Sequence, residues 1–159
     1  MHSICETNDS TLWVVSAGEG IVKITLEASS SLPKVKSAQR FTLDGGKRNS
    51  NYFFVSYQEN DSTIWFGNRG YGAYKMNTRT NQLTPCRIDD VVKNQTVNDI
   101  FAIHKNDEGY WFGTSFGLTR LYQGEYRVYN ETDGFPNNTI HGILEGRDTV
   151  SYTHLRAHE

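Results

Sequence analysis

Six side chains of this sequence carry groups suited to holding a polar, ring-shaped ligand. They are Arg48, Arg69, Tyr71, Asn98, Phe116 and Asn138. Arginine and asparagine donate hydrogen bonds to hydroxyl or acidic groups, and aromatic planes stack on the C–H faces of sugar rings. These residues are therefore our candidate binding residues for an oligosaccharide or another small ligand. An arginine pair among them would favour a sulfated or uronic-acid sugar.

Catalytic and metal-binding motifs find no support in the sequence. It contains no Gly-x-Ser-x-Gly, no phosphate loop and no pair of histidines at metal-ligand spacing. Cys5 and Cys86 form neither a CxxC nor a zinc spacing. Recurring Asn-Asp turns lack the dense oxygen ligands of a calcium loop. We therefore expect no catalytic residue, no metal and no cofactor. Carboxylates such as Glu19 and Asp99 could pair in a hydrolase or lyase, and the sequence gives no sign that they do.

Composition excludes several classes of protein. The 159 residues include 16 Lys+Arg and 18 Asp+Glu, so a net charge of −2 offers no basic field for nucleic acid. No apolar run approaches the roughly 18 residues of a membrane helix, and residues 1–6 lack the basic and apolar regions of a secretory signal. An aromatic share of 13% with 14 Gly favours β structure.

A repeat organises the chain around its tryptophans. Trp13, Trp65 and Trp111 each follow an Asn by five residues and an Asp by four, and each precedes a Gly-containing loop. A short alternating apolar run follows every loop. Spacings of 52 and 46 residues between the tryptophans are typical of propeller blades. A fourth copy begins at Asn138, in the register of Asn98.

Four short antiparallel strands can be expected in each repeat. In the third copy they cover about 99–105, 110–114, 118–122 and 125–129, with the Asn106–Gly109 hairpin turn between the first two. The predicted fold is an all-β propeller fragment of three four-stranded antiparallel blades plus the first strand of a fourth. The blades cover about 1–45, 50–90 and 97–130, and the fourth begins at 138–148. The expected structural core includes five residues: Trp13, Trp65, Ile100, Ile103 and Trp111.

The last residues break with this pattern. Val150–Glu159 back-translates as GTC TCT TAT ACA CAT CTC CGA GCC CAC GAG, which resembles a transposon-end adapter used in sequencing libraries. Ser151 stands where the fourth repeat would carry its tryptophan. We interpret 1–148 as the native partial propeller and 149–159 as a non-native read-through tail. The alternative is a short natural terminal helix.

The third copy resembles a known repeat. Asn98-Asp99-Ile100, Gly109-Tyr110-Trp111-Phe112-Gly113-Thr114, Gly117-Leu118-Thr119-Arg120-Leu121 and Asp133-Gly134-Phe135-Pro136-Asn137-Asn138 are similar to the two-component regulator propeller repeat. The second copy departs from it at Asn68 and Ala73, and the first has Val15-Ser16 in place of Gly-Thr.

This resemblance implies the periplasmic sensor region of a hybrid two-component system histidine kinase, of the kind that Bacteroidetes use to detect glycan fragments. It implies a homodimer in the full-length protein, contact with further blades of the same propeller, and a membrane reached only through segments outside this chain. The kinase is not part of this sequence, so we expect no enzyme activity of the fragment itself. The alternatives are a propeller lyase or glycan hydrolase, and a secreted propeller that mediates protein contacts.

Blade topology gathers the candidate binding residues on one face. The loop between the second and third strands opens on the same face as the crossing to the next blade. That face therefore collects Arg69, Tyr71 and Phe116 from the loops, and Arg48, Asn98 and Asn138 from the crossings. The alternative is that Tyr71 and Phe116 only cover blade edges.

Overall fold

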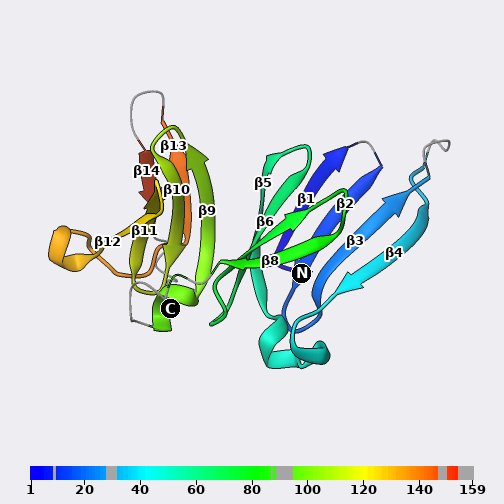
Figure 1. Cartoon of the computed structure of the whole chain (residues 1–159), viewed down its shortest axis with the longest axis horizontal. Coiled ribbons are helices and arrows are strands. Elements are labelled where there is room, and N and C mark those ends of the chain that lie inside the picture. Colours follow the sequence, from blue (N-terminus) through cyan, green and yellow to red (C-terminus); the bar gives the residue numbers. More distant parts are fainter. Residues whose placement is uncertain (9, 28–31, 87, 89–94, 147–149, 154–159) are drawn as a thin grey trace.

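Three four-stranded antiparallel sheets stand side by side in the computed structural model of the chain (Figure 1). The structure describes residues 1–8, 10–27, 32–86, 88, 95–146 and 150–153. Within that part of the chain each sheet is a simple meander, ordered β1-β2-β3-β4, β5-β6-β7-β8 and β9-β10-β11-β12. These sheets are the three predicted blades, so the all-β propeller-fragment fold class is confirmed.

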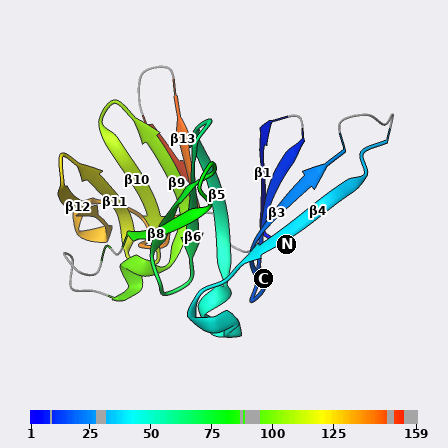
Figure 2. The same cartoon turned by 45° about the vertical axis from the view of Figure 1, so that its right-hand side comes forward.

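Blade 1 contains strands β1 Ser3–Asn8, β2 Thr11–Ser16, β3 Gly20–Leu26 and β4 Val35–Phe41. Blade 2 contains β5 Phe53–Asn60, β6 Thr63–Asn68, β7 Ala73–Asn77 and β8 Gln82–Cys86. Blade 3 contains β9 Ile100–Asn106, β10 Gly109–Thr114, β11 Gly117–Tyr122 and β12 Glu125–Tyr129. Turned by 45°, Figure 2 shows the outer strands β4 and β12 at opposite margins, with β5 and β9 between them.

The repeated Asn-Asp pattern forms the first hairpin of every blade. The side-chain oxygens of Asn8, Asn60 and Asn106 each accept a hydrogen bond from the backbone N–H two residues on, at 3.1, 3.0 and 3.0 Å. An asparagine that bonds its own backbone in this way stabilises a tight turn without a metal. The turn therefore follows from the asparagine, and the second strand begins within three residues of it.

Tryptophans fill the junctions between blades. Trp13 is fully buried and packs 5.9 Å from Phe66 of blade 2, and Trp65 packs 6.0 Å from Phe112 of blade 3. Trp111, Ile100 and Ile103 are buried as well. Burying an aromatic side chain of this size is worth several times the energy of a surface contact, so these junctions hold the blades together.

A basic side chain lies over each tryptophan from the neighbouring strand. Lys23 lies 5.3 Å from the Trp13 ring, Lys75 5.5 Å from Trp65 and Arg120 5.3 Å from Trp111. In all three blades this residue is the direct cross-strand partner of the tryptophan. A cation over an indole face contributes about 0.5–1 kcal/mol at a partly exposed site.

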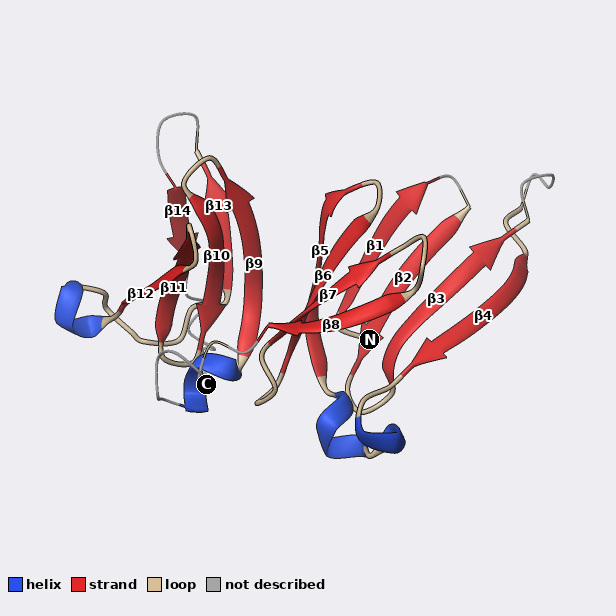
Figure 3. Cartoon of the chain, viewed as in Figure 1, coloured by secondary structure: helices blue, strands red, loops and turns tan. Residues whose placement is uncertain are grey.

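Short 3-10 helices occur in the crossings from an outer strand to the next inner strand, drawn in blue in Figure 3. They are η1 Asp44–Gly46, η2 Arg48–Asn51, η3 Gln95–Asn98 and η4 Glu131–Asp133. The buried Asn51 holds the first crossing, because its side chain bonds Leu43 N–H (2.7 Å) and the Lys47 carbonyl (2.6 Å). Among the described residues the chain has no helix that is long and apolar enough to span a membrane.

The fourth unit contributes two strands, one more than predicted. Strand β13 Gly142–Glu145 pairs antiparallel with β14 Val150–Thr153, which falls inside the segment that we interpret as a read-through tail. Ser151 faces Leu144, as Trp111 faces His104 in blade 3, so the register of the repeat continues. Backbone pairing needs no particular side chain, which is why this hairpin leaves the origin of the tail untested. Residues 149 and 154–159 of that segment lie outside the described residues.

Candidate functional site

Blades 2 and 3 are tied together on the face where we expect the ligand. The β6–β7 loop, Arg69–Gly72, donates from Gly70 N–H (3.1 Å) and Gly72 N–H (2.9 Å) to the same carbonyl oxygen, that of Asn98. Both glycines have φ of +81°, a backbone conformation that only glycine adopts without strain. The loop is thereby fixed against the crossing into blade 3, and Arg69 is held at its start.

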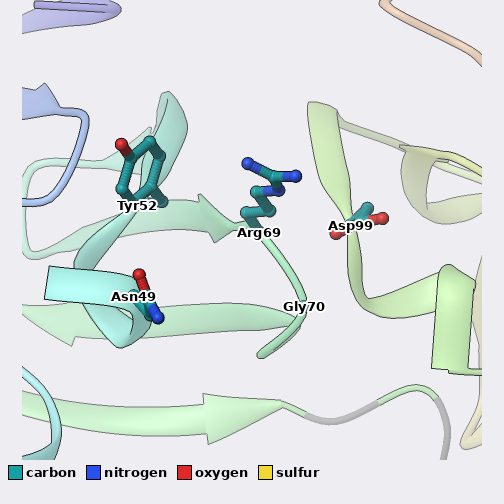
Figure 4. Close-up of a pocket in the computed structure, with 5 residues that line it drawn as sticks. All are labelled: Asn49, Tyr52, Arg69, Gly70 and Asp99. Atoms are coloured by element: carbon teal, nitrogen blue, oxygen red, sulfur yellow. The ribbon is translucent and has the colours of Figure 1, made fainter. Parts of the chain in front are cut away.

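A pocket of about 410 Å³ opens at this junction, as Figure 4 shows. It is lined by Asn49, Tyr52, Arg69, Gly70 and Asp99. Arg69 extends from the end of β6 between Tyr52 on one side and Asp99 on the other. Its backbone N–H donates to the Tyr52 carbonyl at 2.9 Å, so the chain segments before β5 and after β6 form one wall. Asp99, just before β9, forms the opposite wall.

The pocket presents one cation and one anion to solvent. The Arg69 guanidinium lies 5.9 Å from the centroid of the Tyr52 ring. The ring attracts the cation, and the guanidinium N–H groups stay available as hydrogen-bond donors. Asp99 accepts a hydrogen bond from the Ser115 hydroxyl at 3.1 Å, which orients the carboxylate. A ligand that carries an acidic group for Arg69 and hydroxyl donors for Asp99 would satisfy both.

Of the predicted binding residues, Arg69 lines this pocket and Tyr71 lies two residues on in the same loop, 40% exposed. Phe116 is half-buried and packs against the apolar cluster between blades 2 and 3. Its backbone N–H donates to the Thr114 hydroxyl at 3.0 Å. Phe116 therefore contributes to the packing of the blade junction, and a ligand contact at Phe116 stays a prediction.

The other predicted residues occupy structural positions in the crossings. Asn98 is only 1% exposed, beneath the β6–β7 loop that its carbonyl holds. The Asn138 side-chain oxygen accepts from Glu131 N–H at 2.9 Å. Arg48 lies over Gly18 of blade 1, where an added Cβ would come within 2.5 Å of the Arg48 Cγ. Arg48 thus belongs to the junction of blades 1 and 2, and ligand binding at these three residues stays a prediction.

Sequence reasoning missed Asn49 and Tyr52 as pocket residues, and treated Asp99 only as a carboxylate for catalysis. The available signal was register: Tyr52 follows Asn51, and Asp99 follows Asn98, at equivalent points of the repeat. Residues that directly follow the crossing asparagine lie just before the inner strands β5 and β9, so Tyr52 and Asp99 reach the pocket at the junction of blades 2 and 3.

The two carboxylates considered for catalysis bind other partners, in different blades. Glu19 is ion-paired with Arg40 at 3.0 Å in blade 1, and Asp99 bonds Ser115 in blade 3, so each carboxylate has its own partner. A second hollow of about 380 Å³ opens on the opposite face of blade 3, and Lys105 and Tyr110 at its rim already bind Glu59. In the described part of the chain no cluster of three or more His, Cys, Asp or Glu could hold a metal ion.

Glu59 is the centre of the strongest electrostatic cluster, away from the pocket. Burial raises the pKa of the Glu59 carboxyl, but hydrogen bonds from Lys105 (2.6 Å), Trp65 Nε1 (2.7 Å) and Tyr110 (2.8 Å) outweigh burial and hold that pKa below its ordinary value. The bond to Glu59 in turn raises the pKa of Lys105, and burial together with Glu59 raises the pKa of Tyr110. Glu59 and Trp65 come from blade 2 and the other two residues from blade 3, so the cluster fastens that junction.

Comparison with known proteins shows the fold shared with two solved extracellular domains from B. thetaiotaomicron. One is assigned to the hybrid two component system BT4673, with a TM-score of 0.67 and 16% identity over 94% of this chain. The other is assigned to the hybrid two component system BT3049, with a TM-score of 0.62 and 17% identity, again over 94% of this chain. This chain spans only 18% and 25% of their lengths. No protein-family model and no curated protein sequence matches it. The similarity shows that the chain has the fold of these extracellular domains.

Proposed function

We propose that this chain is a ligand-binding segment of an extracytoplasmic sensor of the two-component type, and that the pocket at Arg69 binds an acidic glycan fragment. The observation that carries the proposal is that Arg69 and Asp99, a cation and an anion, line one pocket at a blade junction. Arginine binds carboxylate or sulfate groups through two parallel hydrogen bonds, and an oriented carboxylate accepts from sugar hydroxyls. The fold shared with extracellular domains of hybrid two-component systems supports the sensor role.

Signalling would follow from the position of the site. Residues from two blades form the pocket, so a bound ligand would contact both and favour one relative placement of the blades. A ligand shifts such an equilibrium only by its difference in affinity for the two states. In a periplasmic homodimer this shift would be passed through the membrane to a kinase in the rest of the protein.

Calorimetric titration with sulfated, uronic-acid and neutral oligosaccharides tests this function. Arg69→Met should weaken binding of the acidic sugars about ten- to a hundredfold, because a hydrogen-bonded charge pair is lost. Arg79→Met is the matched control. Arg79 lies in the β7–β8 turn on the opposite face, and its replacement by methionine removes the same charge. Equal affinity of Arg69→Met and wild type, or turnover of a glycan by the chain, would refute the proposal.

A further inference from the structure

One aromatic or imidazole ring from each of four successive repeats lies along the inner edge of the molecule. Ring centroids are 5.5 Å apart between His2 and Phe54, 5.0 Å between Phe54 and Phe101, and 4.7 Å between Phe101 and His141. These four rings, called the ring row below, cross from blade 1 to the fourth unit. Their spacing is that of direct aromatic contact.

A β-bulge at the same point of two blades places the central rings. Phe53 pairs with Asn68 and Val55 with Gly67, which leaves Phe54 without a partner on β6. In blade 3 Ile100 pairs with Thr114 and Ala102 with Gly113, and Phe101 is left over in the same way. A bulged residue leaves the strict alternation of the strand, so its side chain takes a new direction. Phe53 and Ile100 are buried, while the neighbouring Phe54 and Phe101 are only half-buried.

The ring row adjoins the pocket at Arg69. Tyr52 and Asp99 line that pocket, and each lies two residues before a ring of the row, Phe54 and Phe101 respectively. The Phe54–Phe101 contact therefore bridges the same two blades as the pocket does. A ligand held by its acidic group at Arg69 and long enough to extend toward the inner edge meets these two rings next.

We propose that the ring row is an apolar subsite continuous with the pocket, which takes a flat ring face of the ligand. The assignment rests on the proposed function, because Arg69 and Asp99 hold the polar part of the same ligand. Half-exposed phenyl faces attract either the C–H face of a sugar or another aromatic ring, and the exposed His2 and His141 can donate hydrogen bonds at the two ends. The same bulge in two blades places a half-buried phenyl ring at the same point of each, and a shared ligand surface explains this repetition.

Three carboxylate probes separate the ring row from the polar pocket. Acetate carries charge without a ring, phenylacetate adds an aromatic ring, and galacturonate adds a sugar ring. Dissociation constants from NMR titration of the whole chain should show a ring-bearing probe binding tighter than acetate by roughly two- to tenfold. That advantage should disappear in Phe101→Leu and in Phe54→Leu, which keep apolar volume, and persist in Tyr122→Leu on the opposite face. If galacturonate has the higher affinity, the ring row binds the face of a sugar ring; if phenylacetate has it, the ring row binds an aromatic ring.

Each outcome decides between the two proposals. Absence of a ring advantage in the wild type, or its survival in both phenylalanine variants, overturns the ring row. If Arg69→Met leaves acetate binding unchanged while Phe101→Leu abolishes the ring advantage, the ring row stands and the polar site at Arg69 is wrong. Absence of binding by all three probes overturns both.

Discussion

Replacement of Glu59 by glutamine should loosen the junction between blades 2 and 3 by about 2 kcal/mol. The Glu59 side chain is 8% exposed and accepts three hydrogen bonds, from Trp65, Lys105 and Tyr110. Glutamine keeps the shape of the side chain, but one carboxylate oxygen becomes an amide NH2 group. This group is a donor and cannot accept the hydrogen bonds that the oxygen accepted. Loss of a bond between a charged group and a buried partner costs roughly 1.5–3 kcal/mol. Lys105 is 41% exposed and returns to water, so its ion pair adds at most about 1 kcal/mol.

Amide hydrogen exchange measures this loss without requiring cooperative unfolding of the whole chain. A decrease of about 2 kcal/mol corresponds to amides of β5 and β9 exchanging roughly 30-fold faster. Glu125→Gln is the control, because Glu125 is exposed at the start of β12 and loses the same charge. If both variants exchange alike at β5 and β9, the cluster does not fasten the blades and the reasoning fails.

The same variant carries a pH signature. Since the pKa of Glu59 is lower in the folded chain than its ordinary value, its stabilising contribution is present above about pH 4.3 and is lost as the pH falls further. The difference in exchange rate between wild type and Glu59→Gln should therefore be constant near neutral pH and shrink below about pH 4. A difference that grows on acidification would contradict the depressed pKa.

Two substitutions and one property of the unchanged chain test the packing of the blades. Gly113→Ala should destabilise the chain by about 1–3 kcal/mol in thermal unfolding, because the added methyl meets the Ile140 carbonyl oxygen at 2.5 Å; an unchanged melting temperature would show that the segment at Ile140 does not pack there. Arg120→Met should lower the free energy of unfolding by about 0.5–1 kcal/mol in the same assay, because the contact with the Trp111 ring is lost. An unchanged free energy would show that this contact does not stabilise the blade. The apolar outer face of blade 1, where Ile4 is 51% exposed, should cause self-association in sedimentation experiments, and a sharply melting monomer would contradict this.

Local signals made the blades predictable from sequence. Strands expected at 110–114, 118–122 and 125–129 lie within one residue of β10, β11 and β12, because an asparagine turn and a glycine loop mark both ends of the tryptophan strand. A turn of this kind depends on neighbours in sequence alone. The meander then follows from short connections, which leave adjacent strands no choice but to pair.

The neighbours of Phe54 and Glu59 across the blade junction could not be predicted from the sequence. The β-bulge that leaves Phe54 without a partner on β6 has no side-chain signature in the sequence, so the place of its ring could not be predicted. Glu59 and Lys105 hold equivalent positions in adjacent repeats, one residue before Asn60 and Asn106, yet they bind each other. Self-alignment of the repeats superimposes such residues and so conceals that they are partners across a junction.

The division between repeated and unrepeated positions separates the framework from the proposed binding surface. Every blade keeps a tryptophan with a basic cross-strand partner, since each blade must pack on the next by the same geometry. Four residues after the tryptophan, where the loop reaches the pocket face, the repeats carry Ala17, Arg69 and Ser115. Blades 1 and 3 pack with an uncharged residue at this position, so the packing of a blade does not require the charge of Arg69. Arg69 therefore stands where the framework leaves the residue type open, which is where a repeat protein can acquire a ligand without disturbing its fold.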